Sequence, residues 1–283
     1  MLADDSYTEE TLRQTRIGRS MGTDYFGLRD ELTDTERDYL QRTREFIDTE
    51  VVPVINDYWE RAEFPRKLIE KLGGLGIIGD GLDGYGCPPM SPVAAGLINM
   101  ELNRGDGSLG TFHAVQAGLA MRSIHMLGSE EHKQRWLPSM ARLEKLGAFA
   151  LTEPRHGSDA VALETTATPD ADAYVLAGEK RWIGNGTIAD VAVVWARDTS
   201  DGKVKAFLVE KGTAGYRRGS SRARRRCARC GRHTSDSTTC AYPPTAGFPA
   251  PAASKTPAGC WPPPAARSPG PRSATRSPPT KRR

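Results

Sequence analysis

The sequence predicts an α+β fold, in which an all-helical domain is followed by the first part of an antiparallel β domain. Apolar residues recur at helical spacing between capping signals over residues 33–147. From Ala148 onward the pattern changes to short segments rich in β-branched and aromatic residues, separated by turn residues. The composition changes again after Tyr216, so we expect only residues 33–216 to form a core.

Capping residues predict the helices of the first domain. The predicted starts are the capping box Thr33-Asp34-Thr35-Glu36, then Pro65, Ser91-Pro92, about Ser108, and Ser129-Glu130-Glu131. The predicted ends are Pro53, which ends or kinks the first helix, then Gly73-Gly74 and Gly128. Residues 80–89 are rich in glycine and predict a loop, and residues 1–32 are polar and predict an N-terminal arm.

Short segments of the second domain, residues 148–216, are predicted as strands. They are Ala148–Thr152, Thr165–Thr168, Tyr174–Ala177, Lys180–Ile183, Val191–Ala196 and Lys205–Val209. The residues that predict turns between them are Pro169-Asp170, Gly178, Gly186 and Asp201-Gly202. We expect these strands to form the start of an antiparallel, β-barrel-like domain.

The segment 217–283 differs from the rest in charge and composition. It holds 13 Arg, 2 Lys and one acidic residue, Asp236, so its charge is 13 + 2 − 1 = +14. The whole chain carries +4, so the segment 1–216 carries 4 − 14 = −10. The tail contains 12 of the 20 prolines and no Leu, Ile, Val or Met. It lacks the apolar surface that offsets chain entropy, and we expect it to be disordered.

The remaining composition favours a soluble, cytoplasmic protein. The segment 1–30 lacks the apolar stretch of a signal peptide. No run approaches the roughly 18 apolar residues of a membrane span. Cys87 is the one cysteine before the tail, so the expected folded region has no disulfide framework.

Two linked motifs in the β domain carry a family resemblance. Residues 148–159 read Ala-Phe-Ala-Leu-Thr-Glu-Pro-Arg-His-Gly-Ser-Asp, and residues 178–185 read Gly-Glu-Lys-Arg-Trp-Ile-Gly-Asn. The first resembles the flavin signature of the acyl-CoA dehydrogenase family, and the second resembles the motif that follows it there. The strand pair Val191–Arg197 and Ala206–Gly212 extends the likeness, which covers about residues 24–216.

Within that family the chain is most similar to the branch of glutaryl-CoA dehydrogenase and the plant peroxisomal short-chain acyl-CoA oxidase. Trp59–Pro65 and Gly84–Pro88 look most like the oxidase. The resemblance implies FAD as cofactor and an acyl-CoA thioester as substrate. A glutamate removes the α-proton while hydride passes to flavin N5, giving a 2-enoyl-CoA. Dehydrogenases pass the electrons to electron-transferring flavoprotein and oxidases pass them to oxygen.

The resemblance also assigns site residues. It implies that Phe149, Leu151, Thr152, Gly157, Ser158, Trp182, Ile183 and Gly184 line the FAD, with Ser158 also reaching the acyl-CoA. The residue types suit this role, because a flavin ring needs donors from backbone and short hydroxyls, and glycine allows close approach. Gly184 departs from the family's commoner threonine, whose hydroxyl bonds near N5, and the plant oxidase resembles this chain in having glycine there.

Two features of the resemblance limit activity and substrate. The catalytic glutamate of this branch lies in a C-terminal helical domain that also builds the family's tetramer. No glutamate follows Glu210 here, so we assign no catalytic residue and expect the chain as it stands to be inactive. Glutaryl-CoA enzymes place an arginine where this chain has Gly110, so a neutral, short acyl group is expected. The length of the acyl chain stays open.

Other polar residues are interpreted as structural. We expect His113 and His125 to be packing or surface residues, and Glu130-Glu131 to be a helix cap. Asp159 and Glu164 are also interpreted as structural, and no metal site is assigned to the folded region.

The tail has three interpretations, of which two are functional. Cys227, Cys230, His233 and Cys240 suggest zinc, and the runs Arg222–Arg226 and Lys281–Arg283 suggest nucleic-acid binding.

The third interpretation is a shifted reading frame. Nearly every residue after Tyr216 has G or C at the second codon base, whereas a core needs the aliphatics that second-base U encodes; the exceptions are His233, Asp236, Tyr242, Phe248, Lys255 and Lys281. Undoing a one-base shift at residues 240–243, 248–250 and 260–263 allows Val-Arg-Val-Pro, Leu-Pro-Gly and Val-Leu-Ala-Ala. These strings resemble the same branch, so the frameshift is favoured.

Three functional hypotheses follow. The chain is part of an acyl-CoA dehydrogenase, part of an acyl-CoA oxidase, or a non-enzymatic fragment whose basic tail binds nucleic acid. The first is favoured, without a nucleic-acid partner or a membrane span.

Overall fold

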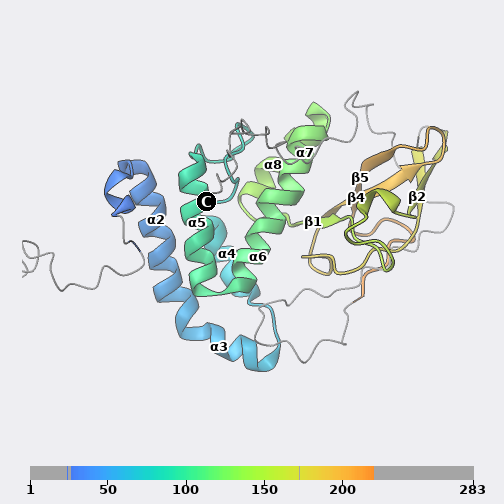
Figure 1. Ribbon diagram of the computed structural model, residues 1–283. Helices are drawn as coiled ribbons and strands as arrows, with labels where there is room; N and C mark the ends of the chain where they lie inside the picture. Colours follow the sequence, from blue (N-terminus) through green and yellow to red (C-terminus); the bar gives the residue numbers. More distant parts are fainter. Residues whose placement is uncertain (1–23, 25–26, 172, 220–283) are drawn as a thin grey trace, which may run out of the picture.

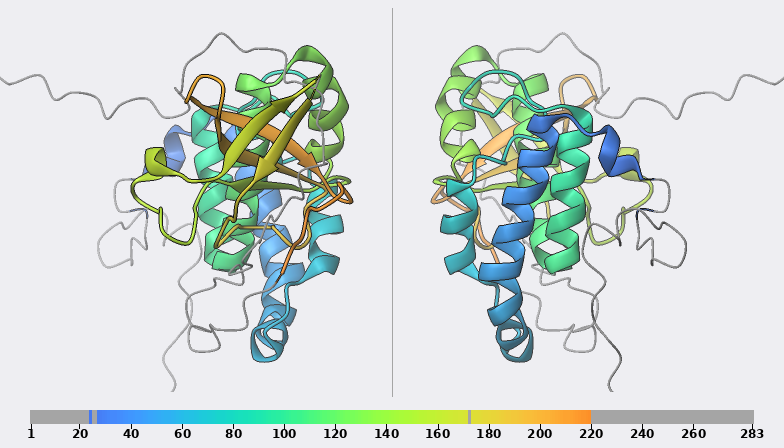
Figure 2. Two further views of the ribbon diagram at one scale, coloured as in Figure 1. Left: turned by 90° about the vertical axis from the view of Figure 1, so that its right-hand side faces the viewer. Right: turned by 90° about the vertical axis from the view of Figure 1, so that its left-hand side faces the viewer.

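The computed structural model describes residues 24, 27–171 and 173–219. Helices occupy residues 28–141 and a sheet occupies residues 147–210, side by side along the molecule (Figure 1). Viewed onto the sheet, the helices lie behind one of its faces (Figure 2, left). The expected order of a helical part followed by a β part is confirmed. Nearly all of the predicted tail, and most of the N-terminal arm, lie outside the described residues.

The helical part combines α, 3₁₀ and π geometry. Its segments are η1 (Leu28–Glu31), α2 (Asp34–Phe46), η2 (Ile47–Val51), α3 (Val52–Arg61), α4 (Arg66–Gly74), α5 (Pro92–Gly105), α6 (Gly107–His113), η3 (Ala114–Met121), α7 (Arg122–Leu127) and α8 (Glu130–Ala141). The segments η2 and η3 are π-helical, and η1 is a 3₁₀ helix. A further 3₁₀ turn, η4 (Ala160–Ala162), follows the first strand of the sheet.

The predicted caps at Thr33, Ser91 and Ser129 are confirmed. The Thr33 hydroxyl accepts the Glu36 N–H at 3.3 Å, and the Glu36 carboxylate accepts the Thr33 N–H at 2.9 Å, which completes the capping box. Ser91 caps α5 through the Ala94 N–H, and Ser129 caps α8 through the His132 N–H. Each cap satisfies a donor that the first turn of a helix leaves unpaired.

Pro53 marks a change of direction and not an end. It is the second residue of α3, and because the π-helical η2 runs into α3 without a break, the N–H that proline lacks interrupts the helical hydrogen bonds here. The π-helical η2 comes directly before it, and α3 turns away from the line of α2 at this point (Figure 1). The long helix predicted from Ser108 to Leu127 is similarly divided, because η3 interrupts it between α6 and α7.

The sheet of the described residues has five strands and is mixed. They are β1 (Gly147–Ala150), β2 (Thr166–Asp170), β3 (Ala173–Ala177), β4 (Val191–Asp198) and β5 (Val204–Glu210). The order is β1-β4-β2-β3, with β5 paired to β4. The β2–β3 and β4–β5 pairs are antiparallel as expected, whereas β1–β4 and β2–β4 are parallel. The expectation of purely antiparallel pairing therefore needs correction, since strands distant in sequence can pair in either direction.

The strand predicted at Lys180–Ile183 does not form. Trp182 and Asn185 have φ of 61° and 60°, in the left-handed region, and a strand requires extended backbone. The segment between β3 and β4 is instead a loop of turns, in which Lys180 and Ile183 are buried. The β-branched and aromatic residues that predicted a strand here lie within this loop.

Strand β4 is buried on both faces. Its residues alternate between two apolar cores: Val191, Val193 and Trp195 pack with the helices, while Ala192, Val194 and Ala196 pack within the sheet. Burying each valine fully stabilises the fold by about 1.5–3 kcal/mol. The strand thus joins the helical core to the sheet core.

Gln116 ties the helices to the start of the sheet. Its side chain lies in η3 and is fully buried. The amide nitrogen donates to the carbonyls of Met140 and Lys145 at 3.1 and 3.0 Å, and the amide oxygen accepts the Gly147 N–H at 2.7 Å. Gly147 lies so close to Met140 that a Cβ there would be 2.5 Å from the methionine methyl. This contact fixes where β1 begins.

Candidate functional site

The two sequence motifs meet in the structure. The first occupies β1 and the loop 151–159 that follows it, and the second occupies the loop 178–190 that leads into β4. The Arg181 N–H donates to the Thr152 carbonyl at 2.8 Å, and the Asn185 side chain donates to the Gly147 carbonyl at 3.2 Å. Segments well separated in sequence therefore lie side by side.

A buried ion pair joins the two loops. The Lys180 ammonium donates to the Glu153 carboxylate at 2.7 Å and to the Leu151 carbonyl at 3.1 Å. The two side chains are 0% and 3% exposed. The carboxylate also accepts the N–H groups of Glu164 and Thr165 at 2.6 and 2.9 Å, and the Thr165 hydroxyl at 2.5 Å. Such complete hydrogen bonding is what makes a buried charge tolerable.

These contacts set the charge of Glu153. Burial alone would raise the pKa of this carboxyl. The Glu164 N–H, the Lys180 ammonium and the Thr165 donors outweigh burial and lower the pKa from 4.5 to about 2. Glu153 is therefore an anion across the physiological pH range and has no proton to give, so it is a structural partner of Lys180 and not a general acid.

Trp182 is the most exposed large aromatic residue of the two motif loops. Its side chain is 47% exposed, and its backbone lies in the left-handed region that bulky residues seldom adopt. The Arg181 guanidinium lies 5.2 Å from the centre of the indole ring. Neighbouring structure must hold such a conformation in place, and residues held in this way cluster at ligand sites.

Gly184 packs directly against the helical part. A Cβ on Gly184 would lie 2.7 Å from Cγ2 of Val115, which lies in η3. The structure therefore gives a steric reason for the glycine at this position, where the family more often has threonine. The sequence showed this glycine as a departure from the family motif. The residue that explains it, Val115, lies in η3, far earlier in the chain.

Small polar groups of the first loop are open to a ligand. Within the part of the chain that the structure describes, the hydroxyls of Thr152 and Ser158 make no hydrogen bond. Gly157 and Ser158 are exposed, and a Cβ on Gly157 would have no neighbour within 4 Å. The loop 151–159 thus offers hydroxyl donors and open space. Trp182 is exposed on the loop 178–190, which is bonded to it.

The other predicted site residues have less exposed side chains. Phe149 and Leu151 are half-buried against the helical core, and Phe149 packs edge-on against Trp195 with ring centres 5.9 Å apart. Ile183 is 2% exposed and belongs to the sheet core. Its backbone, more than its side chain, is therefore the part that a ligand could reach.

The sequence interpretation missed Glu153 and Lys180 as a pair. Both stand inside the quoted motifs, so the available signal was one acid and one base beside the residues that were predicted to line the FAD. Asp159 was interpreted as structural and is exposed, whereas Glu164 pairs with Arg155 at 2.6 Å and with His156 at 3.2 Å.

The structure also shows what His113, His125 and Glu130 contact. His113 is buried and contacts the Asn99 side chain at 3.2 Å, and burial lowers its pKa. His125 packs edge-on against Tyr85, whose hydroxyl donates to Glu130 at 2.8 Å. Among residues 24, 27–171 and 173–219, no group of three or more His, Cys, Asp or Glu could hold a metal ion. The suggested zinc ligands of the tail lie outside this part.

Gly110 is closely covered by a neighbouring helix. It is buried in α6, and a Cβ there would lie 2.3 Å from the Asn103 amide on α5. An arginine at this position would have to displace Asn103.

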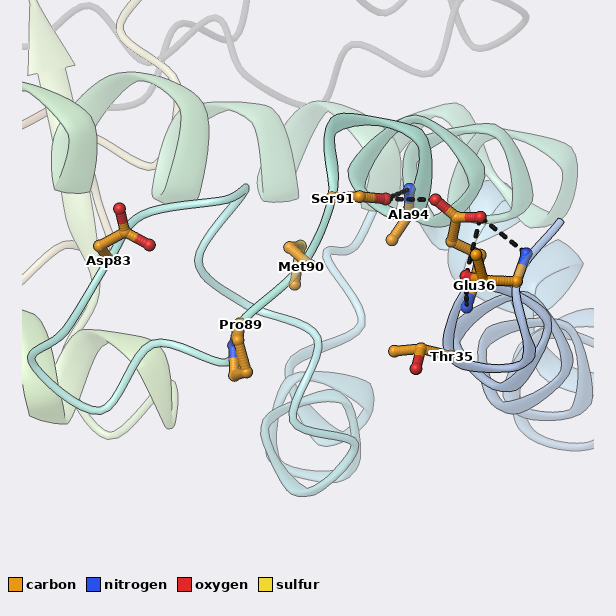
Figure 3. A pocket seen from close by; sticks show the side chains of 8 residues that line it. Thr35, Glu36, Asp83, Pro89, Met90, Ser91 and Ala94 are labelled. Carbon is orange, nitrogen blue, oxygen red and sulfur yellow. Dashed lines mark hydrogen bonds between the residues drawn. The ribbon is translucent and has the colours of Figure 1, made fainter.

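A separate hollow of about 430 Å³ lies at the starts of α2 and α5 (Figure 3). Glu36 and Ser91 face each other there, and the Ser91 hydroxyl donates a hydrogen bond to the Glu36 carboxylate at 2.5 Å. Each of these side chains therefore already has a hydrogen-bond partner. The hollow contains none of the motif residues. Nor does any helix in the described ranges have the length and apolarity needed to cross a bilayer.

Two family models match the chain in succession. "Acyl-CoA dehydrogenase, N-terminal domain" matches residues 33–144, and "Acyl-CoA dehydrogenase, middle domain" matches residues 148–237. The second match includes both motif loops and continues beyond Tyr216.

Individual proteins give the same result. The human mitochondrial short-chain specific acyl-CoA dehydrogenase is 35% identical over 204 residues, which are 71% of this chain and 49% of that protein. An acyl-CoA dehydrogenase of Bacillus subtilis strain 168 is 36% identical over 61% of this chain and 47% of its own length. A glutaryl-CoA dehydrogenase from Mycobacterium smegmatis, solved in complex with FADH2, has a TM-score of 0.71 and 36% identity over 80% of this chain and 58% of that one. The chain spans about half the length of the human and B. subtilis relatives.

Proposed function

The chain belongs to the acyl-CoA dehydrogenase family, and we propose that it is the N-terminal and middle part of an FAD-dependent enzyme that oxidises an acyl-CoA to a 2-enoyl-CoA. The observation that carries the proposal is the meeting of the two motif loops, one with hydroxyls that bond no described residue and the other with an exposed tryptophan. The FADH2 complex of the M. smegmatis relative supports the choice of cofactor.

The residues present fit a flavin. Thr152 and Ser158 offer hydroxyls that no described residue engages, Gly157 leaves space for close approach, and Trp182 offers a flat apolar surface. We propose that these residues, with Phe149, Leu151, Ile183 and Gly184, hold the ring, and that Ser158 also reaches the acyl-CoA. The flavin would supply the hydride acceptor, while the protein residues orient the ring and exclude water.

Activity requires a catalytic base, and we assign that role to no residue of this chain. α-Proton abstraction needs a positioned group within hydrogen-bond reach of the substrate. The family resemblance places that glutamate in a C-terminal domain, and no glutamate follows Glu210. Glu153, which lies in the first motif loop, is already bonded to Lys180 and two backbone amides. We therefore propose that the chain as it stands is inactive.

The proposed substrate is a short, neutral acyl-CoA. Gly110 provides no cation for a distal carboxylate, and Asn103 already fills the space that a side chain would need. A dicarboxylic substrate would leave its second charge unpaired in a buried place, at a cost of several kcal/mol. The short-chain specificity named for the human relative agrees with this choice.

An oxidase is the second candidate. It is favoured by Gly184, which cannot supply the hydroxyl that threonine offers in the commoner motif. Electron-transferring flavoprotein is the proposed acceptor for a dehydrogenase and oxygen for an oxidase, so oxygen consumption separates them. A homotetramer in the cytoplasm is the proposed state of the intact enzyme.

The test uses both the chain as it stands and a frame-restored protein. Purified chain is mixed with FAD and butyryl-CoA while the flavin absorbance is followed. We expect weak FAD retention and no bleaching, whereas substrate-dependent bleaching would show that a residue of this chain serves as base. The frame-restored protein should oxidise butyryl- or hexanoyl-CoA and leave glutaryl-CoA unchanged. Comparable turnover of glutaryl-CoA would contradict the argument from Gly110.

A further inference from the structure

The Glu153–Lys180 pair is placed where it can hold both motif loops at once. Glu153 follows Thr152 directly, and Lys180 precedes Trp182 by two positions. The ammonium bonds the Leu151 carbonyl as well as the carboxylate, and the next N–H along, from Arg181, bonds the Thr152 carbonyl. These hydrogen bonds connect residues 151–153 with residues 180–181.

The pair also fixes the far end of the first loop. The Glu153 carboxylate accepts the N–H groups of Glu164 and Thr165, and the Glu153 N–H donates to the His156 carbonyl at 2.9 Å. The loop that contains Gly157 and Ser158 is thus closed around one carboxylate. Removing that carboxylate would release both ends of the loop.

Stability alone does not explain why charged groups occupy this place. Replacing a buried ion pair with apolar residues is often neutral or stabilising. An ion pair with directional hydrogen bonds does, however, specify one arrangement of the backbone. Trp182 needs such support, because its left-handed conformation is unfavourable without it.

We propose that Glu153 and Lys180 are positioning residues, which fix loops 151–158 and 180–184 in the single arrangement that receives the flavin ring. This inference rests on the proposed function. Neither side chain contacts the ligand in this proposal, since both are buried beneath the loop surface. They act through Thr152 and Ser158 on one loop and Trp182 on the other.

The test compares Lys180→Met, Lys180→Arg and the double variant Glu153→Gln/Lys180→Met in the full chain. The double variant removes both charges together, so it avoids an unpaired buried charge and keeps the test open if a single variant fails to fold. Lys205→Met is the matched control. Lys205 pairs with the buried Asp198 at 2.5 Å at the C-terminal end of β4, and the bonds of these two side chains go to Tyr174, Ser200 and Asp201, outside both motif loops.

Two readouts are measured, amide hydrogen exchange of peptides spanning the loops and FAD affinity by fluorescence titration. We expect Lys180→Met and the double variant to exchange faster in residues 151–158 and 180–185, and Lys180→Arg to exchange near the parent rate. If the loops then adopt the competent arrangement about a tenth of the time, the Kd for FAD rises about tenfold. Lys205→Met should change neither readout, even where it lowers the melting temperature similarly.

Two outcomes would overturn the proposal. One is a folded double variant whose loops exchange at the parent rate. The other is an equal effect of Lys205→Met on the loops, which would indicate a general loss of stability. If the parent chain binds no FAD, the proposed cofactor role of this chain fails, whereas the exchange rates still decide whether the pair positions the loops.

Discussion

Val115 and Gly184 share one small space between the helices and the loop before β4. Val115 is buried, and its β-branched side chain is stiff about χ1, so it cannot turn aside easily. A methyl group on Gly184 would overlap it, with a separation of 2.7 Å. The two residues are therefore coupled, and a side chain at 184 requires a smaller residue at 115.

Gly184→Ala should lower the free energy of unfolding by about 1–3 kcal/mol, because overpacking forces neighbouring atoms apart. Adding Val115→Ala should recover part of that loss, so the two changes are not additive. Gly157→Ala is the control, since its Cβ would meet nothing within 4 Å. Urea denaturation of the parent, the single variants and the double variant measures the cycle, and strict additivity would disprove the coupling.

Glu153 should make the stability of the chain depend on pH in acid. Its pKa is lowered to about 2 in the folded state, so its contribution is complete above the unfolded value near 4.5 and is lost as the pH falls towards 2. A lowering of this size corresponds to about 3 kcal/mol. Glu153→Gln should flatten the fall in stability between these pH values. Glu144→Gln removes the exposed ion pair with Arg142 and should leave that fall in stability unchanged. If stability fell equally steeply with pH in the parent and both variants, the pH dependence would not come from Glu153.

At the scale of elements, η3 is the connection between the two parts of the molecule. Gln116 uses both ends of its amide to bond the end of α8 and the start of β1. It does so from a π-helical segment, a geometry that is often found at functional sites. Val115, one position earlier, is the neighbour of Gly184.

Gln116→Leu should destabilise the chain by about 2–4 kcal/mol, because it leaves the buried Gly147 N–H without its acceptor and removes the amide donor from the Met140 and Lys145 carbonyls. Gln134→Leu serves as the control, since the Gln134 side chain bonds Glu130 at 3.1 Å in an exposed place. Chemical denaturation gives both values. A loss no larger than that of the control would show that the amide does not connect the helices to the sheet.

Local signals predicted the elements better than their pairing. The caps at Thr33, Ser91 and Ser129 depend on contacts within one helical turn, so the sequence displays them directly. The π geometry of η3 and the parallel pairing of β1 with β4 depend on residues far apart in the chain. The order of the elements and the antiparallel pairing of strands adjacent in sequence were therefore predictable, and the parallel pairing of β4 with β1 and β2 was not.

The same limit applies to the candidate site. Both motif loops could be located from the sequence, and the structure places them together. The ion pair that joins them links two separate loops, and residue type alone did not distinguish Lys180 in a loop from Lys180 in a strand. Trp182 was mistaken for a strand residue for the same reason, because only tertiary contacts hold its left-handed backbone.

At the scale of the whole molecule, the composition divides the chain in a way that folding alone does not explain. The segment 1–216 carries −10 and the segment 217–283 carries +14, as counted above. The acidic part contains every described strand and helix. The middle-domain match runs to residue 237, so its last 237 − 216 = 21 positions fall in the Arg- and Pro-rich segment. The change in composition therefore falls inside a domain and not between domains.

We propose that this change records a one-base shift of the reading frame near codon 217. Apart from six positions, the segment 217–283 uses only amino acids with G or C at the second codon base, which excludes the aliphatics that a middle domain needs. Resequencing the DNA at this codon should reveal the shift, and restoring the frame should extend the protein by well over about 100 residues with aliphatic content and helical spacing. Codons upstream of Tyr216, translated in the same shifted frame, are the control and should give a similar Arg- and Pro-rich composition. A restored frame that meets stop codons at once, or that remains rich in Arg and Pro, would show that the tail is the protein's own sequence.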